Sequence, residues 1–136
     1  MNREHCVTGS SRCVAVNGSD TAAALIALGA QMMVRSSSGE RIYDAEEFFI
    51  GPAIDIERMT VLEPGDILTH VRIPGDWGGA RFYWEKARDR KSWDWALVSV
   101  AASIFESDGV IQRARISLNG VAPYPLRLTE VEDLIQ

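Results

Sequence analysis

The stretch RFYWEKARDRKSWDWALVSVA, residues 81–101, carries the strongest pattern in this chain of 136 residues. Aromatic residues cluster toward both of its ends, and charged residues fill its centre. The pattern predicts two packed segments joined by an exposed loop, because large aromatic side chains pack while charged ones stay in water. A loop anchored in this way is suited to a flat, anionic ligand. A second interpretation stays open here, in which the aromatics are ordinary core and the charges form a solvated turn.

The bulk properties of the chain are those of a globular protein, with 46% hydrophobic and 24% charged residues. Its length allows one domain or pieces of two. A net charge of -5 and a pI near 5.0 argue against general nucleic-acid binding. No stretch approaches the roughly 18 apolar residues that a membrane span needs, and the first residues lack the apolar core of a secretory signal. A cytoplasmic location is the expectation.

The segment before residue 18 is polar and contains His5, Cys6 and Cys13. Two cysteines do not make a disulfide framework, and together with one histidine they cannot complete a four-ligand metal site. The two cysteines are therefore expected to be free thiols, or ligands of a site whose other ligands lie elsewhere.

A short buried helix is predicted next. Ser19 or Asp20 can cap it, residues 23–28 supply its apolar face, and Gly29 stands where helices commonly end in a left-handed turn.

Strands and turns follow this helix. Residues 31–35 and 40–43 predict a hairpin, and Asp44 predicts a capped helical turn behind it. Residues 67–73 alternate as a strand does. Proline and glycine crowd residues 74–79, which is therefore the candidate boundary between subdomains.

The C-terminal part predicts a second hairpin, with strands at 97–105 and 110–118 around Asp108 and Gly109, a pair that accepts the backbone angles of a tight turn. A helix is expected over 129–135.

Thr129 would cap that helix with Glu132 three residues later, as in a capping box. The sequence stops inside the helix, so we expect either a fragment or a helix that packs on something else. These elements together predict an α+β fold, in which the end of an α/β subdomain is followed by a small antiparallel sheet packed with helices.

Several segments, taken in order, resemble the flavoprotein (medium) subunit of the molybdenum hydroxylases, the family of xanthine dehydrogenases, aldehyde oxidoreductases and carbon monoxide dehydrogenases. The resembling segments are SDTAAALIALGA (19–30), FFIGP (48–52), LEPGDILTHVRIP (62–74), YWEKARDRKSWDWALVSVAA (83–102) and ARISLNGVAPYPLR (114–127).

The resemblance implies site residues and a cofactor, FAD. Asp20 matches an aspartate of the flavin pocket, Leu68 a hydrophobic contact with the ring system, and Lys86 a lysine near the polar edge of the ring. Trp95 matches an aromatic beside the isoalloxazine. An ammonium group there would stabilise a reduced, anionic flavin, and an aromatic wall would exclude water.

The N-terminal segment resembles the subgroup of these flavoproteins that carries an extra [4Fe-4S] cluster, in which Cys13 matches a ligand. The glycine-rich phosphate loops and the other cluster cysteines of the family lie upstream of the matched segments, and this chain does not contain them. The cluster is therefore expected only in the full-length subunit, and the isolated chain is expected to be inactive.

The resemblance implies an oxidoreductase subunit that passes electrons from iron–sulfur clusters through FAD to an acceptor. Residues 1–76 would be the C-terminal part of the FAD-binding domain, and 77–136 the start of the C-terminal domain. The implied partners are a molybdopterin-binding large subunit and a [2Fe-2S] small subunit, and a partner's signal would also permit a periplasmic location. The alternative function is a non-catalytic fragment or subunit-docking module without bound flavin.

Overall fold

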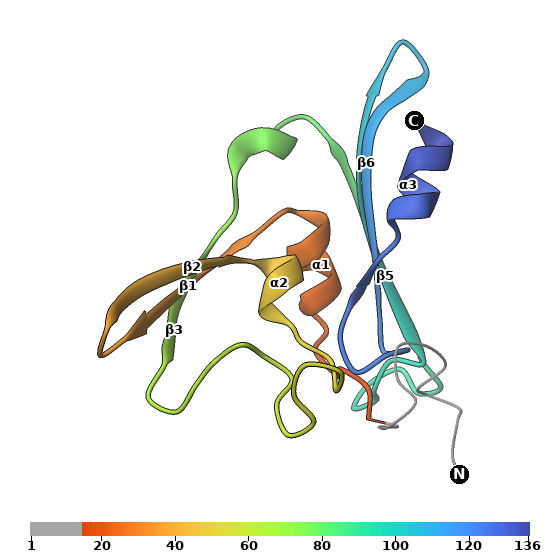
Figure 1. Cartoon of the computed structure of the whole chain (residues 1–136). Coiled ribbons are helices and arrows are strands. Elements are labelled where there is room, and N and C mark those ends of the chain that lie inside the picture. Colours follow the sequence, from red (N-terminus) through yellow and green to blue (C-terminus); the bar gives the residue numbers. More distant parts are fainter. Residues whose placement is uncertain (1–14) are drawn as a thin grey trace.

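Two antiparallel sheets organise the chain in the computed structural model, which describes residues 15–136. The small sheet has the strand order β2-β1-β3, and the long sheet has the order β4-β5-β6-β7. In Figure 1, α1 lies between the two sheets and α3 lies against β6. The strands are β1 (Gln31–Ser36), β2 (Gly39–Asp44), β3 (Ile67–Arg72), β4 (Arg81–Ala87), β5 (Val98–Ser107), β6 (Val110–Asn119) and β7 (Leu126–Arg127). The helices are α1 (Ala22–Ala27), α2 (Ala45–Phe48), α3 (Thr129–Ile135) and the 3-10 turn η1 (Gly75–Trp77). The α+β prediction is confirmed.

The core of the small sheet forms where α1 and α2 cover the β1–β2 hairpin. Ile26 of α1, Met32 and Val34 of β1, and Phe48 of α2 are all buried in one cluster. Gly29 has a φ of 61°, so the predicted left-handed end of α1 is confirmed. The hairpin is also confirmed, with Gln31 paired to Asp44 at its open end.

The β5–β6 hairpin forms the centre of the long sheet, as predicted. Asp108 and Gly109 have φ values of 53° and 77°, the positive angles that a tight two-residue turn needs. Small side chains let α1 approach this sheet closely, since Ala23 and Ala27 pack directly on Ala101. The close approach brings the N-terminal end of α1 next to β4 and the loop that follows it.

The side-chain caps predicted for α1 and α2 are not made. Helix α1 begins after Thr21 without a side-chain cap, and Asp20 instead binds a lysine of β4. Asp44 does occupy the N-cap of α2, but its carboxylate accepts a hydrogen bond from Gln31 across the hairpin. Each carboxylate thus binds a side-chain donor brought close by the tertiary structure, in place of the helix N–H groups.

The capping box predicted for α3 is wrong. Leu128 is the N-cap, and the Glu132 carboxylate points away from the helix start into the sheet. It accepts hydrogen bonds from the N–H of Ile116 at 2.7 Å and from the guanidinium of Arg127 at 2.8 Å. A buried carboxylate needs strong donors, and a guanidinium with a backbone N–H supplies more than one helix N–H could.

The segment between the sheets is fixed to the long sheet by Trp77. This residue of η1 is buried, and the guanidinium of Arg113 on β6 lies 4.0 Å from its ring centroid. A cation over an aromatic face is attractive. The proline and glycine residues of 74–79 predicted a boundary in this segment. They gave no sign of the contact between Trp77 and Arg113.

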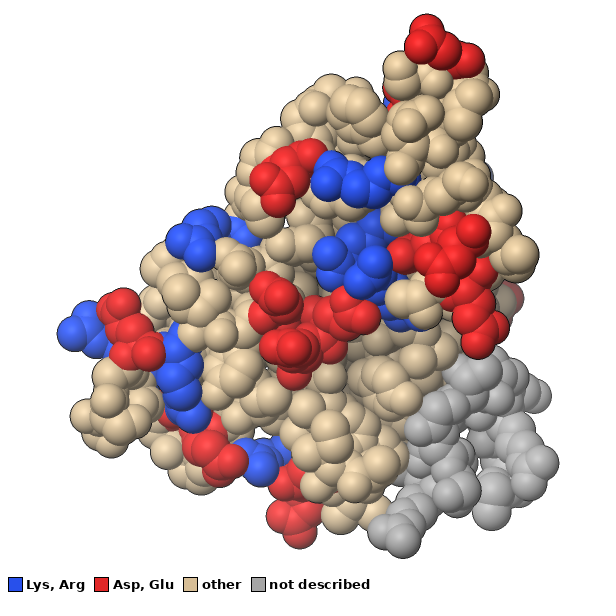
Figure 2. Space-filling view, turned by 45° about the horizontal axis from the view of Figure 1, so that its top comes forward, with Lys and Arg blue, Asp and Glu red and all other residues tan. Residues whose placement is uncertain are grey.

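The surface mixes the two signs of charge. Figure 2 shows acidic and basic side chains interspersed on the face in view, with no broad field of one sign. Every residue of β3 is exposed, and Lys86 is the only residue of β4 that is not. In the described part of the chain, no helix is long and apolar enough to cross a membrane.

Candidate functional site

An ion pair joins the start of α1 to β4. The Nζ of Lys86 lies 2.8 Å from Oδ1 and 2.9 Å from Oδ2 of Asp20, two residues far apart in the sequence. The lysine side chain is only 9% exposed, whereas that of Asp20 is 52% exposed. The positive charge is therefore partly desolvated, and one carboxylate that still contacts water balances it.

The indole of Trp95 stands beside this pair and is 73% exposed. Its ring packs against the backbone at Gly18, where an added Cβ would lie 2.7 Å from a ring carbon. Since real Cβ atoms do not approach that closely, the residue facing the ring must be glycine or the indole must move. The site thus has an aromatic face seated on the backbone and open to solvent.

The loop from residue 88 to 94 is held by Asp94. Its Oδ2 accepts hydrogen bonds from the N–H of Asp89 at 3.0 Å and of Arg90 at 2.8 Å. The N–H of Arg90 lowers the pKa of the Asp94 carboxyl below its ordinary value, and the nearby guanidinium of Arg90 also lowers it. Trp93 has a φ of 55° and is 95% exposed. The predicted exposed, charged loop is confirmed, and it joins β4 to β5. The expected packing of the aromatics that flank it is wrong, because Trp93 and Trp95 lie in the loop and the three aromatics of β4 are 46–55% exposed.

Two hollows share Asp20 and Trp95. The outer hollow, of about 290 Å³, is lined by Asp20, Lys86, Trp93, Asp94 and Trp95. The inner hollow, of about 260 Å³, lies where the indole faces the chain before α1 and the start of β5, and it is lined by residues 16–20, Trp95, Ala96, Ser99 and Asn119.

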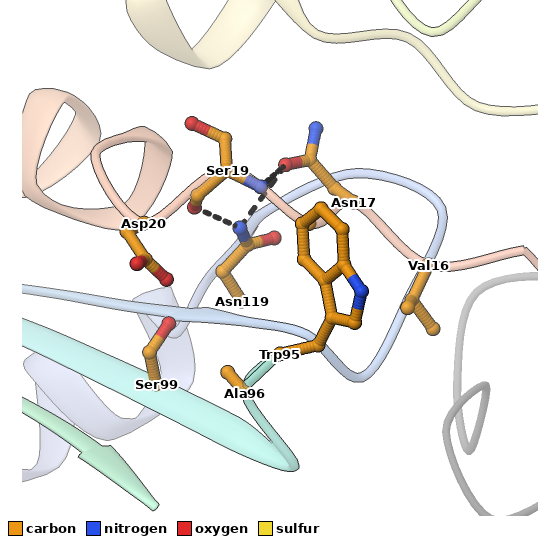
Figure 3. Close-up of a pocket in the computed structure, with 9 residues that line it drawn as sticks. Val16, Asn17, Ser19, Asp20, Trp95, Ala96, Ser99 and Asn119 are labelled. Carbon is orange, nitrogen blue, oxygen red and sulfur yellow. Dashed lines mark hydrogen bonds between the residues drawn. The ribbon is translucent and has the colours of Figure 1, made fainter. Parts of the chain in front are cut away.

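Asparagine side chains organise the inner hollow, as Figure 3 shows. The Nδ2 of Asn119 donates to Oδ1 of Asn17 at 3.1 Å and to the carbonyl oxygen of Ser19 at 2.8 Å. The N–H of Ser19 also donates to Asn17 Oδ1, at 3.0 Å. The other amide atom, Asn119 Oδ1, is buried and accepts no hydrogen bond within the described residues. Buried acceptors are rarely left unpaired, so this oxygen marks a place suited to a donor.

The remaining predicted residues lie apart from this site. Leu68 is on β3 of the small sheet, paired with Val34, and lines neither hollow. Cys13 lies outside the described residues. Among residues 15–136, no group of histidine, cysteine, aspartate and glutamate side chains could hold a metal ion.

The arrangement suits a planar ligand with a polar edge. An open indole face can stack on a flat ring, and the ammonium of Lys86 can stabilise negative charge on it. The unpaired acceptor of Asn119 can take a hydrogen bond from a ring N–H. The described residues contain no glycine-rich loop of the kind that cradles phosphates, so they suit the ring end of a nucleotide cofactor better than its phosphates.

Comparison with known proteins assigns the chain to a family. Residues 3–76 match the FAD binding domain in molybdopterin dehydrogenase, and residues 82–136 match the CO dehydrogenase flavoprotein C-terminal domain. The chain belongs to this family of flavoproteins. The resemblance to the molybdenum hydroxylase flavoprotein subunit, and with it the FAD assignment, is confirmed at the level of the family.

The relatives are subunits of several different enzymes. The chain is 37% identical over 130 residues to the aldehyde oxidoreductase FAD-binding subunit of Escherichia coli (strain K12), covering 94% of this chain and 39% of that one. It is 33% identical to the carbon monoxide dehydrogenase medium chain of Hydrogenophaga pseudoflava, covering 81% and 36%. Reconstituted CO dehydrogenase from Oligotropha carboxidovorans matches with a TM-score of 0.77 at 32% identity, covering 87% of this chain and 39% of that chain. The chain thus spans less than half the length of these relatives.

Sequence reasoning missed most of the inner hollow. Asn17 and Asn119 each precede a glycine, so their pattern indicated only turns. Ser99 lay inside a predicted strand. Nothing local distinguishes a turn asparagine from one whose amide joins two distant segments, because the partner is decided by the packing of α1 on β5 and β6.

Proposed function

We propose that this chain is part of the FAD-binding subunit of a molybdenum-cofactor hydroxylase, where FAD passes electrons from iron–sulfur clusters to an acceptor. Family membership and the names of the relatives support the proposal. When bound, FAD supplies the redox chemistry, and the protein contributes binding, orientation and electrostatics.

The observation that carries the proposal is the convergence of Asp20, Lys86 and Trp95 around one hollow. These are three of the four residues that the resemblance assigned to the flavin, and they come from a helix start, a strand and a loop. We propose that Trp95 covers the ring and excludes water, and that Lys86 favours added negative charge on it. Asp20 would hold the ammonium in place and moderate its field.

The fourth residue, Leu68, would contact the ring from the small sheet. Its side chain is 37% exposed, which leaves surface for such a contact. This role requires that the bound flavin extend from the hollow beside Trp95 as far as β3.

We further propose the organisation and partners that the resemblance implied. Residues 1–76 would complete the FAD-binding domain and 77–136 would open the C-terminal domain, and the family matches at 3–76 and 82–136 support this division. The relatives named as medium chains belong to multi-subunit enzymes. The partners would be a molybdopterin-binding large subunit and a [2Fe-2S] small subunit, and the location would be the cytoplasm.

Cys13 is proposed as one ligand of a [4Fe-4S] cluster in the full-length subunit. The resemblance of the N-terminal segment supports it. In a subunit that carries the cluster, Cys13→Ser should lower the iron and labile-sulfide content, whereas Cys6→Ser should not. Equal losses from the two variants would contradict the assignment.

A chimera tests the flavin proposal. This chain would replace the matching 130 residues of the Escherichia coli relative, so that the preceding part of that subunit supplies the rest of the binding site. We expect the purified chimera to carry FAD with a bound flavin spectrum, and Trp95→Ala to change the flavin fluorescence. Arg35→Ala, on the far hairpin, is the control. A folded chimera without FAD would contradict the proposal.

The alternative is a non-catalytic docking module, and the exposed apolar side chains of β3 and β4 favour it. Mixing the purified chain with FAD bears on this choice in one direction, since a bound, shifted flavin spectrum would exclude the docking module. We expect weak or no binding by the chain alone, because the phosphate loops of the family are not in its sequence. A flavin-free chimera that still assembles with the partner subunits would favour the docking module.

A further inference from the structure

Strand β4 is an open edge of the long sheet. Among the described residues its only neighbour is β5, so one row of its backbone N–H and C=O groups has no strand beside it. Natural edge strands are usually protected by a central lysine, a proline or a bulge. The centre of β4 instead reads Phe82, Tyr83 and Trp84, with exposures of 55%, 55% and 46%. The centre of this edge is therefore aromatic, and its charged residues, Arg81, Glu85 and Lys86, stand only on either side of that centre.

The sequence of β4 is complementary to itself when reversed. Side chains alternate between the two faces, so Arg81, Tyr83 and Glu85 share one face and Phe82 and Trp84 share the other. In an antiparallel pair of two copies centred on Tyr83, each Arg81 lies opposite a Glu85. Each Phe82 then lies opposite a Trp84. Opposite charges and aromatic pairs at directly opposed positions are the pairs that stabilise a sheet.

The aromatic face of this pairing opens onto a groove. Phe82 and Trp84 pair in register with Ser103 and Ala101 of β5, the residues that face α1. Between α1 and β4 lies a groove of about 420 Å³ lined by residues 24, 27, 28, 82–84 and 101–103. Aromatic rings from a second strand beside β4 would cover this groove, because they stand next to Phe82 and Trp84 on the same face.

Strand β3, an edge of the small sheet, lacks this property. Strand β3 also presents apolar side chains, among them Ile67 and Val71, but it carries no carboxylate. A reversed second copy of β3 would place Arg72 opposite an uncharged residue or another cation. Charge complementarity therefore selects β4 and not β3.

We infer that this chain forms a two-fold dimer in which β4 pairs antiparallel with β4 of a second copy, centred on Tyr83. The two long sheets then continue into one another across the dimer axis. The inference stands on the edge strand alone and does not depend on flavin binding. It predicts that the two charges flanking the aromatic centre decide whether the dimer forms.

Two charge reversals and their mixture test the pairing by sedimentation velocity over a range of concentrations. Arg81→Glu gives the edge two carboxylates, and Glu85→Arg gives it two guanidinium groups. Each variant alone should dimerise about thirtyfold more weakly, because two attractive pairs become repulsive. Mixed in equal amounts, they should form a heterodimer about as tight as the unaltered dimer. Each charge at the interface again meets its opposite, and the exposed Arg81–Glu106 pair within the chain, which Arg81→Glu removes, contributes little.

Arg35→Glu, a charge reversal on the exposed β1–β2 hairpin, is the matched control and should dimerise like the unaltered chain. Circular dichroism of each variant establishes that it is folded. A chain that stays monomeric at all concentrations would overturn the inference. So would a dimer that neither reversal weakens, a mixture that fails to associate, or polydisperse aggregation without a dimer. If one single variant does not fold, the double variant Arg81→Glu/Glu85→Arg must dimerise normally.

Discussion

Replacing Glu132 by alanine tests the buried network that fixes α3 to the long sheet. The Glu132 side chain is 3% exposed and accepts hydrogen bonds from Arg127 and from the N–H of Ile116. Arg127 also binds Glu46 of α2, at 3.0 Å, so the network joins α2, β6, β7 and α3. These bonds raise the pKa of the Arg127 guanidinium, chiefly through its hydrogen bond to Glu132. Removing the carboxylate leaves a half-buried cation and a backbone N–H short of acceptors.

The expected loss of unfolding free energy is about 3 kcal/mol for Glu132→Ala, the low end of the range for breaking a buried ion pair. The low end applies because Arg127 is 27% exposed and retains Glu46. Glu132→Gln keeps an oxygen for the N–H of Ile116, so it should lose about 1–2 kcal/mol. Glu130→Ala, on an exposed position of the same helix, should stay within about 0.5 kcal/mol of the unaltered chain.

Urea unfolding followed by circular dichroism measures these differences as shifts of the midpoint at constant slope. The order should be Glu130→Ala, then Glu132→Gln, then Glu132→Ala as the least stable. Dimerisation would stabilise every variant, so all are compared at one protein concentration. If Glu132→Ala loses no more than Glu130→Ala, the network does not hold α3, and the reasoning is refuted.

Three further outcomes concern the candidate site. Gly18→Ala should displace the Trp95 indole, because the added Cβ would lie 2.7 Å from the ring, and the tryptophan fluorescence should change; an unchanged spectrum would show that the backbone gives way instead. Lys86→Met in the flavin-loaded chimera should lower the flavin reduction potential by about 30 mV for each tenfold loss of preference for the reduced form, and an unchanged potential with FAD bound would count against Lys86. Hydrogen bonds from the backbone, chiefly from the N–H of Arg90, lower the pKa of Asp94 below its ordinary value, so its contribution to stability is present above the ordinary pKa and is lost as the pH falls through the folded pKa. The protection factors of the N–H groups of residues 89 and 90, which correct for the intrinsic slowing of exchange in acid, should therefore fall below about pH 4, and Asp94→Asn should remove that fall; unaltered protection in acid would refute it.

Local chemistry determined the turns and strands of this chain. Gly29 and the Asp108–Gly109 pair have positive φ. The end of α1 and the turn between β5 and β6 were therefore predicted from residue types alone. The alternation of residues 67–73 predicted β3, since the pattern of a strand lies in its own residues. The charged block within residues 81–101 predicted the exposed loop between β4 and β5, but the packing expected of the aromatics beside it did not follow.

Side-chain partners were less predictable, because several candidates compete for each polar group. Glu132 fitted a capping box by spacing, but folding brought Arg127 and the N–H of Ile116 closer and with better geometry. Asp20 fitted a helix cap and instead met Lys86. A carboxylate binds the strongest hydrogen-bond donors near it. Which donors are near depends on how the helices and strands pack together.

The sequence by itself determined most of the helices and strands, the family and the residue types available to a flavin. Only the tertiary structure decided that Asp20, Lys86 and Trp95 meet around one hollow while Leu68 lies on the other sheet. It also decided that, among residues 15–136, β4 has no strand on its outer side. The physical reason is that backbone angles and alternation depend on neighbouring residues, whereas ion pairs, hollows and sheet edges depend on how α1 packs between the two sheets.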